Sequence, residues 1–559
     1  MTPEGARRLL RYGIALMPAS FVAGVALQIH GVSLSPLLLA IVGAGNVLAT
    51  GGSLLLFLAG RVPELHTHDC VVFLGVPIAG AAWAWIRHTT QRRVTSRPAS
   101  RRTRPSWPAA LALPFIVAVL YSDVSEVLIV EFGLPSLLQA SLAGAALLIW
   151  VYRDELAPAR ILSHPLTVLL AAYCVVVFAS MAWADDVALA DVQIVKTIKN
   201  LGVYLVAAML ATSWIALRRC FAAMALIGAG LSAVSLFQIT TGNTLGELGG
   251  LATLVYGNIY EDASDVRAAG PVNDANFYGQ ILVIVIPLAL SLASTATRRR
   301  WQVFWVVVAM LITGGVLTTY SRGAMLALTV MTALVLASMR AKVTHIALAT
   351  AAVVALLLAM PGNVGRRFMT FETFLPRHRY YVPADSSFEK RKLLLATTAR
   401  MFADHPIRGV GAGNFTTFFP RYSNEAGSPA EHFYRAGEVE HPHSLYLELG
   451  AETGSIGLIL FIAIAGTAFA QLRQGRQRLV DLGQRDRQIR IAFGLTMALC
   501  AYLVTSVFLH GYTQRYFWLL LALATAVSRL TADEARDAPP AVAMRTESPV
   551  PPVPEWAAA

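Results

Sequence analysis

One histidine stands where the chain enters a long apolar run, a position that suits acid–base chemistry. His443 follows Pro442 and precedes Gly450, Gly454 and Gly457. Because proline is tolerated at the first helical position, we expect a helix to begin here with His443 in its first turn, where the positive helix end attracts phosphate and disfavours a charged imidazole. The glycine spacing predicts close approach of a neighbouring helix. His443 is then available as a base, or it is an interfacial histidine that only hydrogen-bonds a loop.

One arginine has a residue type and a position that suit phosphate binding. Arg322 opens an apolar run within Ser321-Arg322-Gly323. Arg391 lies with Lys390 and Lys392 in the second large loop, at a predicted surface helix over residues 387–403. A guanidinium stays charged and holds phosphate oxygens through two parallel hydrogen bonds. The alternative for Arg322 is an arginine that only snorkels to the membrane interface.

A third arginine precedes a turn and another apolar run. Arg267 is followed by Gly270-Pro271 and Asn273-Asp274, a turn signal in which Asn273 or Asp274 can cap the next helix. Turn chemistry does not explain the arginine, which either binds an anion or forms a salt bridge with the acidic residues around it.

Motifs for metal or cofactor chemistry are missing from the sequence. The outer loops contain no Asp-x-Asp pair, and the chain has neither a GxSxG elbow nor HExxH. Gly409, Gly411 and Gly413 have no preceding strand and no Lys-Ser/Thr, so we interpret them as a turn. The four cysteines form no CxxC. We therefore expect no metal and no cofactor, and phosphate would be neutralised by arginine.

Composition identifies the elements that must hold these residues. The chain has 559 residues, of which 56% are hydrophobic and 14% charged, with a mean hydropathy of +0.58. A soluble enzyme is excluded, since soluble domains are about a quarter charged. The net charge of +12 does not indicate nucleic acid, because the basic residues are distributed over alternate loops.

Apolar runs long enough to span a bilayer predict an all-α integral membrane protein with about twelve core transmembrane helices. An N-terminal hydrophobic extension raises the total to about fourteen. The core runs are 107–123, 133–152, 164–184, 198–215, 219–239, 275–296, 301–318, 322–339, 343–361, 443–472, 489–509 and 513–530.

Basic residues in alternate loops set the orientation, because Lys and Arg near span ends stay on the cytoplasmic side. Those loops contain Arg87 to Arg104, Arg153 with Arg160, Arg218-Arg219, Arg298 to Arg300, Arg340 with Lys342, and Arg473 to Arg490. The candidate site residues then all face the opposite, periplasmic side.

Five regions follow from this pattern. They are an N-terminal membrane extension with a basic cytoplasmic loop (1–106), the first part of the membrane core (107–361), a large periplasmic loop (362–442), the last part of the core (443–530) and a proline-rich, disordered cytoplasmic tail (531–559). The number of crossings within residues 1–106 stays open. Loops as long as 362–442 usually have a task, and substrate contact is the natural hypothesis.

These residues resemble the bacterial O-antigen ligase and Wzy-type polymerase superfamily, which includes membrane O-oligosaccharyltransferases. The family motif of His, then Asn/Ser/Gln, nine residues, Gly, two residues and Gly is matched by His443, Ser444, Gly454 and Gly457. Ser321-Arg322-Gly323 and the segment from Arg267 to Asn276 are similar to further family segments, as is His405-Pro406 leading to Gly409-Val410-Gly411. The likeness covers about residues 107 to 530, and the N-terminal extension departs from the family pattern.

The resemblance implies a metal-independent, inverting glycosyltransferase of the bacterial inner membrane that acts on its periplasmic side. It would move a glycan from undecaprenyl pyrophosphate to an acceptor hydroxyl, most simply lipid A core in lipopolysaccharide biosynthesis. A polymerase would use another glycan and an oligosaccharyltransferase a protein. Arg322, Arg267 and Arg391 would bind the donor pyrophosphate, and His443 would orient or deprotonate the attacking hydroxyl. Glu448 and Glu452 do not share the helix face of His443.

A transporter or flippase of lipid or polysaccharide is the alternative from another class. Transporters usually place polar groups at mid-membrane and contain paired repeats. Here the candidate residues gather at one membrane face and no repeat is obvious, which favours the enzyme.

Overall fold

The computed structural model describes residues 107–156, 158–242, 250–256, 266–338, 344, 386–425, 441–483, 486–511 and 514–538. The predicted N-terminal extension at 1–106 lies outside the described residues. So do nearly all of the predicted span at 343–361, much of the predicted loop at 362–442, and the tail from residue 539.

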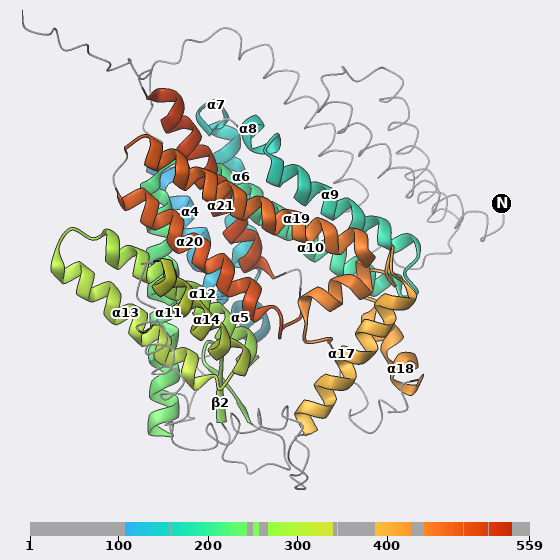
Figure 1. Ribbon diagram of the computed structural model, residues 1–559. Helices are drawn as coiled ribbons and strands as arrows, with labels where there is room; N and C mark the ends of the chain where they lie inside the picture. The colour runs from blue at the N-terminus through green and yellow to red at the C-terminus, as the bar shows by residue number, and fades with distance from the viewer. Residues whose placement is uncertain are drawn as a thin grey trace, which may run out of the picture.

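The first half of the described chain is helical (Figure 1). Its elements are α4 (Trp107–Tyr121), α5 (Val124–Phe132), α6 (Leu137–Val151), α7 (Arg153–Leu156), α8 (Pro158–Leu162), α9 (Pro165–Ala179), η1 (Ser180–Ala182), α10 (Val187–Leu210) and α11 (Trp214–Thr241).

The second half begins with a hairpin and continues with helices. Its elements are β1 (Thr253–Tyr256), β2 (Val266–Gly270), α12 (Ala275–Thr295), α13 (Arg299–Thr318), α14 (Arg322–Ser338), α17 (Ser386–Asp404), α18 (Phe415–Glu425), α19 (Leu445–Asp481), α20 (Asp486–Thr505) and α21 (Arg515–Asp537). The surface helix predicted at 387–403 is confirmed as α17.

Seven helices of the described residues are long and apolar enough to span a membrane, or eight if the bent pair of α4 and α5 forms one span. Such helices satisfy every backbone group internally, as hydrocarbon requires. The chain is therefore a multi-pass α-helical membrane protein. The count of about twelve core helices stays a prediction.

Helix α12 is the centre of the bundle. Its apolar side chains, from Ile281 to Leu292, are almost all buried, and α11, α13, α14 and α20 pack around it. The carboxylate of Asp274 caps its first turn, accepting hydrogen bonds from the amides of Asn276 at 2.7 Å and Phe277 at 2.9 Å. The predicted cap is confirmed, and it fixes the end of α12 that follows Arg267.

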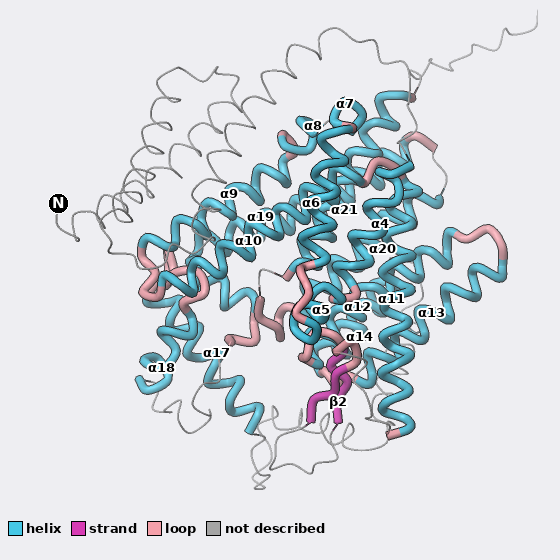
Figure 2. Tube along the Cα trace, turned by 180° about the vertical axis from the view of Figure 1, so that it is seen from behind, coloured by secondary structure: helices cyan, strands magenta, loops and turns pink. Residues whose placement is uncertain are grey.

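The basic ends of several helices meet at one end of the bundle. Arg160 before α9 forms an ion pair with Asp533 of α21 at 2.8 Å, and Arg529 donates to the carbonyl of Ala211 between α10 and α11 at 2.7 Å. Figures 1 and 2 show this end, with α7 and α8, opposite the end that carries β2, α17 and α18. The separation of basic loops from the candidate site residues agrees with the predicted alternation.

Three features differ from the sequence expectations. Strands β1 and β2 form an antiparallel hairpin, a small β element in the predicted all-α fold. Helix α10 begins at Val187 rather than near residue 198, because polar residues extend the helix beyond its apolar run. Helix α21 continues to Asp537, past the predicted start of the tail at residue 531.

Candidate functional site

Helix α19 is broken, and the break positions the segment that follows His443. Gly454 has φ +66° and ψ −169°, so residues 445–453 form a short helix that is bent away from residues 455–481. A Cβ at Gly454 would collide with the carbonyl of Ile407. The prediction that a neighbouring helix approaches here is wrong for Gly454, because the approaching segment is the loop before residue 409. Glycine is required for both the φ and the space.

The glycine-rich segment at 409–413 terminates this short helix. The amides of Val410 and Gly411 donate to the carbonyls of Ala451 and Glu452 at 2.8 and 2.9 Å. The Glu452 carboxylate in turn accepts from the amide of Gly413 at 2.7 Å. The segment is therefore a turn, as predicted, and its backbone satisfies the carbonyls that the helix break exposes. Glu452 has a structural task here.

The prediction that His443 lies in the first turn of a helix is wrong. The helix begins at Leu445 with Ser444 as its N-cap residue, so His443 precedes the helix. The backbone of His443 has φ +47°, a left-handed conformation that costs a non-glycine residue about 1–2 kcal/mol. Strain of this kind is retained where the surrounding structure requires it, and it concentrates at functional sites.

The imidazoles of His441, His443 and His510 form a cluster with the phenyl ring of Phe277. His510 stacks on His441 with ring centroids 4.1 Å apart and meets His443 edge to face at 5.5 Å. Phe277 of α12 packs edge to face on His510 at 5.0 Å. Since stacked rings do not direct their nitrogens to one point, this cluster is a packing arrangement, and no group of metal-binding geometry occurs within the described residues.

Burial lowers the pKa of two of these imidazoles. Together with the neighbouring His441 and His443, it lowers the pKa of His510 from 6.5 to about 2. Burial and, to a lesser extent, the charge of Lys196 also lower the pKa of His441. The Nδ1 atom of His510 is buried without a hydrogen-bond partner among the described residues.

Arg267 lies on β2, half-buried, and joins the hairpin to two helices. Its Nε donates to the carbonyl of Thr319 at 2.9 Å and its Nη2 donates to Oδ1 of Asn276 at 3.1 Å. Asn276 precedes Phe277, which contacts His510. Asn276 and Phe277 thus connect Arg267 to the imidazole cluster. The turn alone does not account for an arginine at this position.

Arg322 is the first residue of α14. It follows Thr319, whose carbonyl accepts the hydrogen bond from Arg267, by three residues. Thr319 is buried, Tyr320 has φ +48° and Ser321 is buried. The hydroxyls of Thr319 and Ser321 accept hydrogen bonds from the amides of Ser321 and Ala324, at 3.2 and 3.4 Å. These bonds fix the turn between α13 and α14, and α14 begins directly after it at Arg322.

The segment between α20 and α21 links the arginine turns to His443. Ser506 accepts from the amide of Leu445 at 3.0 Å, and the carboxylate of Glu448 accepts from the amide of Gly511 at 2.6 Å. Phe508 lies against Gly323, where a Cβ would be only 3.1 Å from the Phe508 Cβ. Glu448 thus holds the loop that carries His510.

All non-glycine residues with positive φ in the described part of the chain occur just before or at the start of helices. They are Asp123, Asn273, Tyr320 and His443, preceding or capping α5, α12, α14 and α19. Three of them adjoin the predicted site segments. Four strained turns at neighbouring helix starts indicate a site whose geometry is over-determined by its surroundings.

Arg391 lies apart from these contacts. It is half-buried on α17, the helix that packs against α19 through Phe402 beside Gly450. Figure 1 shows the first turns of α17 at the same end of the molecule as β2. The structure thus connects Arg267, the Arg322 turn and His443, and the grouping of Arg391 with them stays a prediction.

Sequence reasoning did not identify His510 or His441 as members of this site. His441 was visible in the motif itself, two residues before His443. His510 lies in a different segment, and the only sequence signal was a polar residue directly after an apolar run.

The fold is that of a multi-pass membrane protein, and this group of arginines and histidines at the ends of its helices is its candidate site. Residues 305–462 match the family model described as O-antigen ligase. This segment contains Arg322, Arg391 and His443, and it confirms the resemblance to the O-antigen ligase and Wzy-type superfamily, a family of glycosyltransferase-like enzymes. No curated protein matches the chain.

Proposed function

We propose that this protein is an O-antigen ligase. It would transfer a glycan from undecaprenyl pyrophosphate to a hydroxyl of lipid A core, without a metal, at the periplasmic face of the bacterial inner membrane. The observation that carries the proposal is the set of contacts that joins Arg267, the Arg322 turn and His443 at one end of the helix bundle. The opposite end carries the basic loops, which favours a periplasmic site.

The reaction is one displacement at the anomeric carbon. The acceptor oxygen forms the new glycosidic bond while the bond to the pyrophosphate oxygen breaks, so the configuration inverts. His443 takes the hydroxyl proton, and the pyrophosphate leaves with the bonding electrons. Arg322 and Arg267, joined by Arg391 from α17, stabilise its developing charge, because fixed cations act most strongly where water is scarce.

The role of His510 is to position His443. Its ring contacts His443 from one side and Phe277 and His441 from others. An uncharged His510 ring holds the His443 imidazole in place. It adds no positive charge that would oppose proton uptake by His443. His510 therefore acts through His443 and is a positioning residue.

The test is transfer by the purified full-length protein in lipid nanodiscs with EDTA present. The donor is undecaprenyl pyrophosphate carrying a labelled glycan, and separate reactions offer lipid A core, a second lipid-linked glycan or a Ser/Thr peptide. Label on lipid A core is expected. Label on the second glycan or on the peptide would replace the ligase with a polymerase or an oligosaccharyltransferase. Transbilayer movement of the donor without any transfer would support a flippase instead.

A further inference from the structure

A pocket of about 370 Å³ lies beside the candidate site, between α5, the hairpin and the start of α12. Its volume falls within the range of about 300–1,000 Å³ that small-ligand sites occupy. Its wall contains carboxylates, aromatic rings and aliphatic side chains, among them Asp123, Glu126, Glu131, Asn273, Phe277 and Tyr516.

A broken helix forms one wall of this pocket. Helices α4 and α5 are bent by 54°, and Asp123 at the bend has φ +53°. Non-helical backbone within a membrane protein is tolerated where it is buried in protein or lines a cavity, and broken helices commonly line substrate sites. Asn273, a second residue with left-handed backbone, lines the same pocket.

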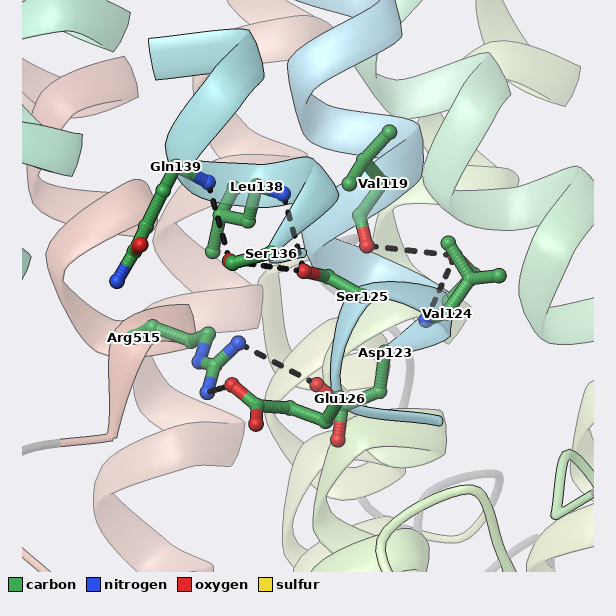
Figure 3. Close-up of polar contacts among 10 residues, drawn as sticks. Val119, Asp123, Val124, Ser125, Glu126, Ser136, Leu138, Gln139 and Arg515 are labelled. Atoms are coloured by element: carbon green, nitrogen blue, oxygen red, sulfur yellow. Dashed lines mark hydrogen bonds and ion pairs between the residues drawn. The ribbon is translucent and has the colours of Figure 1, made fainter. Parts of the chain in front are cut away.

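The charged groups of the pocket carry an excess of negative charge. Figure 3 shows the guanidinium of Arg515 pointing towards Asp123 and Glu126. Its Nη1 lies 3.4 Å from the Asp123 carboxylate and its Nη2 2.7 Å from that of Glu126. Glu131 adds a third carboxylate and lies across Gly250, where a Cβ would be 3.0 Å from its Cγ. The guanidinium of Arg515 therefore pairs with two of the three carboxylates that line the pocket. Carboxylate oxygens accept hydrogen bonds but donate none.

The pocket adjoins the candidate site through a single side chain. Phe277 lines the pocket and also packs on His510. The next residue towards the N-terminus, Asn276, accepts a hydrogen bond from Arg267. A molecule in the pocket is thus separated from the imidazole cluster by one phenyl ring.

We propose that this pocket binds a sugar ring of the acceptor, an inference that rests on the proposed function. The carboxylates accept hydrogen bonds from sugar hydroxyls, and the half-buried ring of Phe277 offers apolar surface to the sugar's C–H groups. The negative excess selects neutral or amino sugars and rejects uronic acids. The pocket is distinct from the arginines, which suit the anionic donor.

Sugar binding is measured without donor, so that it does not depend on turnover. The full-length protein in detergent is mixed with methyl glucoside, methyl glucosaminide or methyl glucuronide, and saturation-transfer NMR reports contact with each. The first two sugars are expected to show signal and the glucuronide none. Equal signal from all three, or signal from the glucuronide alone, would overturn the proposal.

Variants place the binding in the pocket. Glu131 is exposed, so Glu131→Gln is compatible with folding and is expected to weaken neutral-sugar binding about tenfold, as loss of a charged hydrogen-bond acceptor does. Glu131→Arg should admit the glucuronide. The matched control is Asp185→Asn, an exposed carboxylate before α10 that does not line the pocket, and it should bind as the unaltered protein does.

The transfer reaction separates this proposal from the proposed function. If transfer occurs, Glu131→Gln should raise the acceptor KM and leave kcat and the donor KM unchanged. An unchanged acceptor KM together with unchanged sugar binding would contradict the proposal that this pocket binds the acceptor sugar. If no acceptor receives glycan but the NMR signals and their dependence on Glu131 persist, the pocket stands as a sugar site and the ligase function falls.

Discussion

The imidazole of His510 meets that of His443 edge to face, with ring centroids 5.5 Å apart. His510 reaches this place because Glu448 holds Gly511 through a 2.6 Å hydrogen bond and Leu445 holds Ser506. The start of α19 and the end of α20 are thereby fixed to each other. The orientation of His443, the proposed base, therefore depends on His510, which lies in the segment between α20 and α21.

The ring of His510 is expected to matter more than its nitrogens. His510→Ala should lower kcat by about 10²-fold, because a misplacement of about 1 Å in catalytic geometry costs that much, while His510→Phe keeps the contacts with Phe277 and His441 and should retain most activity. Steady-state transfer kinetics check this, with the donor KM expected to be similar in both variants. Equal loss in the two variants would indicate a chemical role for the nitrogens.

Stability should fall as the pH falls below about 6.5. Burial lowers the pKa of His510 from 6.5 to about 2, so the unfolded chain binds a proton below pH 6.5 that the folded protein does not. The stabilising difference is complete above the unfolded pKa and is lost towards acid, by at most about 1.4 kcal/mol per pH unit. Thermal unfolding in detergent between pH 5 and 8 measures it. His510→Phe should flatten the curve; an unchanged curve would show that the slope comes from other groups.

Arg322 is expected to require a guanidinium. Arg322→Ala should reduce kcat/KM by about 10²–10³-fold, the usual cost of removing one group that stabilises developing charge, and Arg322→Lys should also be poor because an ammonium cannot make two parallel hydrogen bonds. Arg421→Ala is the control, since Arg421 pairs with Glu425 on the exposed surface of α18. Near-normal transfer by Arg322→Ala would remove this residue from the mechanism.

The break in α19 should depend on glycine. Gly454→Ala places a Cβ against the carbonyl of Ile407 in a backbone with φ +66°, and we expect a lower unfolding temperature together with loss of transfer. Gly466→Ala lies in the same helix with no atom within 4 Å of the added Cβ and should be neutral. The two unfolding curves are compared directly. Equal unfolding temperatures for the two variants would contradict the prediction, because they would show that the break in α19 does not require glycine.

Much of the helical fold follows from local sequence. The apolar runs that fall within the described residues lie in helices between α4 and α21. Asp274 caps α12, as its position before an apolar run predicts. The glycine-rich turn was also identified, because no strand or Lys-Ser/Thr accompanies it. These features depend on neighbouring residues in the chain.

The features that sequence did not reveal depend on contacts between distant segments. His510 joins His443 only after α20 and α19 pack together. The break at Gly454 follows from the approach of Ile407, and apolar periodicity continues through it. The pocket beside Phe277 arises where α5, the hairpin and α21 meet, so no single segment contains its signal.

The most direct test of the glycan-transfer mechanism is the rate at which purified His443→Ala protein transfers labelled glycan to lipid A core, beside the unaltered protein and His164→Ala. His164 precedes α9 at the opposite end of the bundle and controls for loss of an imidazole. The mechanism predicts no product above background for His443→Ala and normal product for His164→Ala. A His443→Ala protein that transfers glycan at the unaltered rate would contradict it.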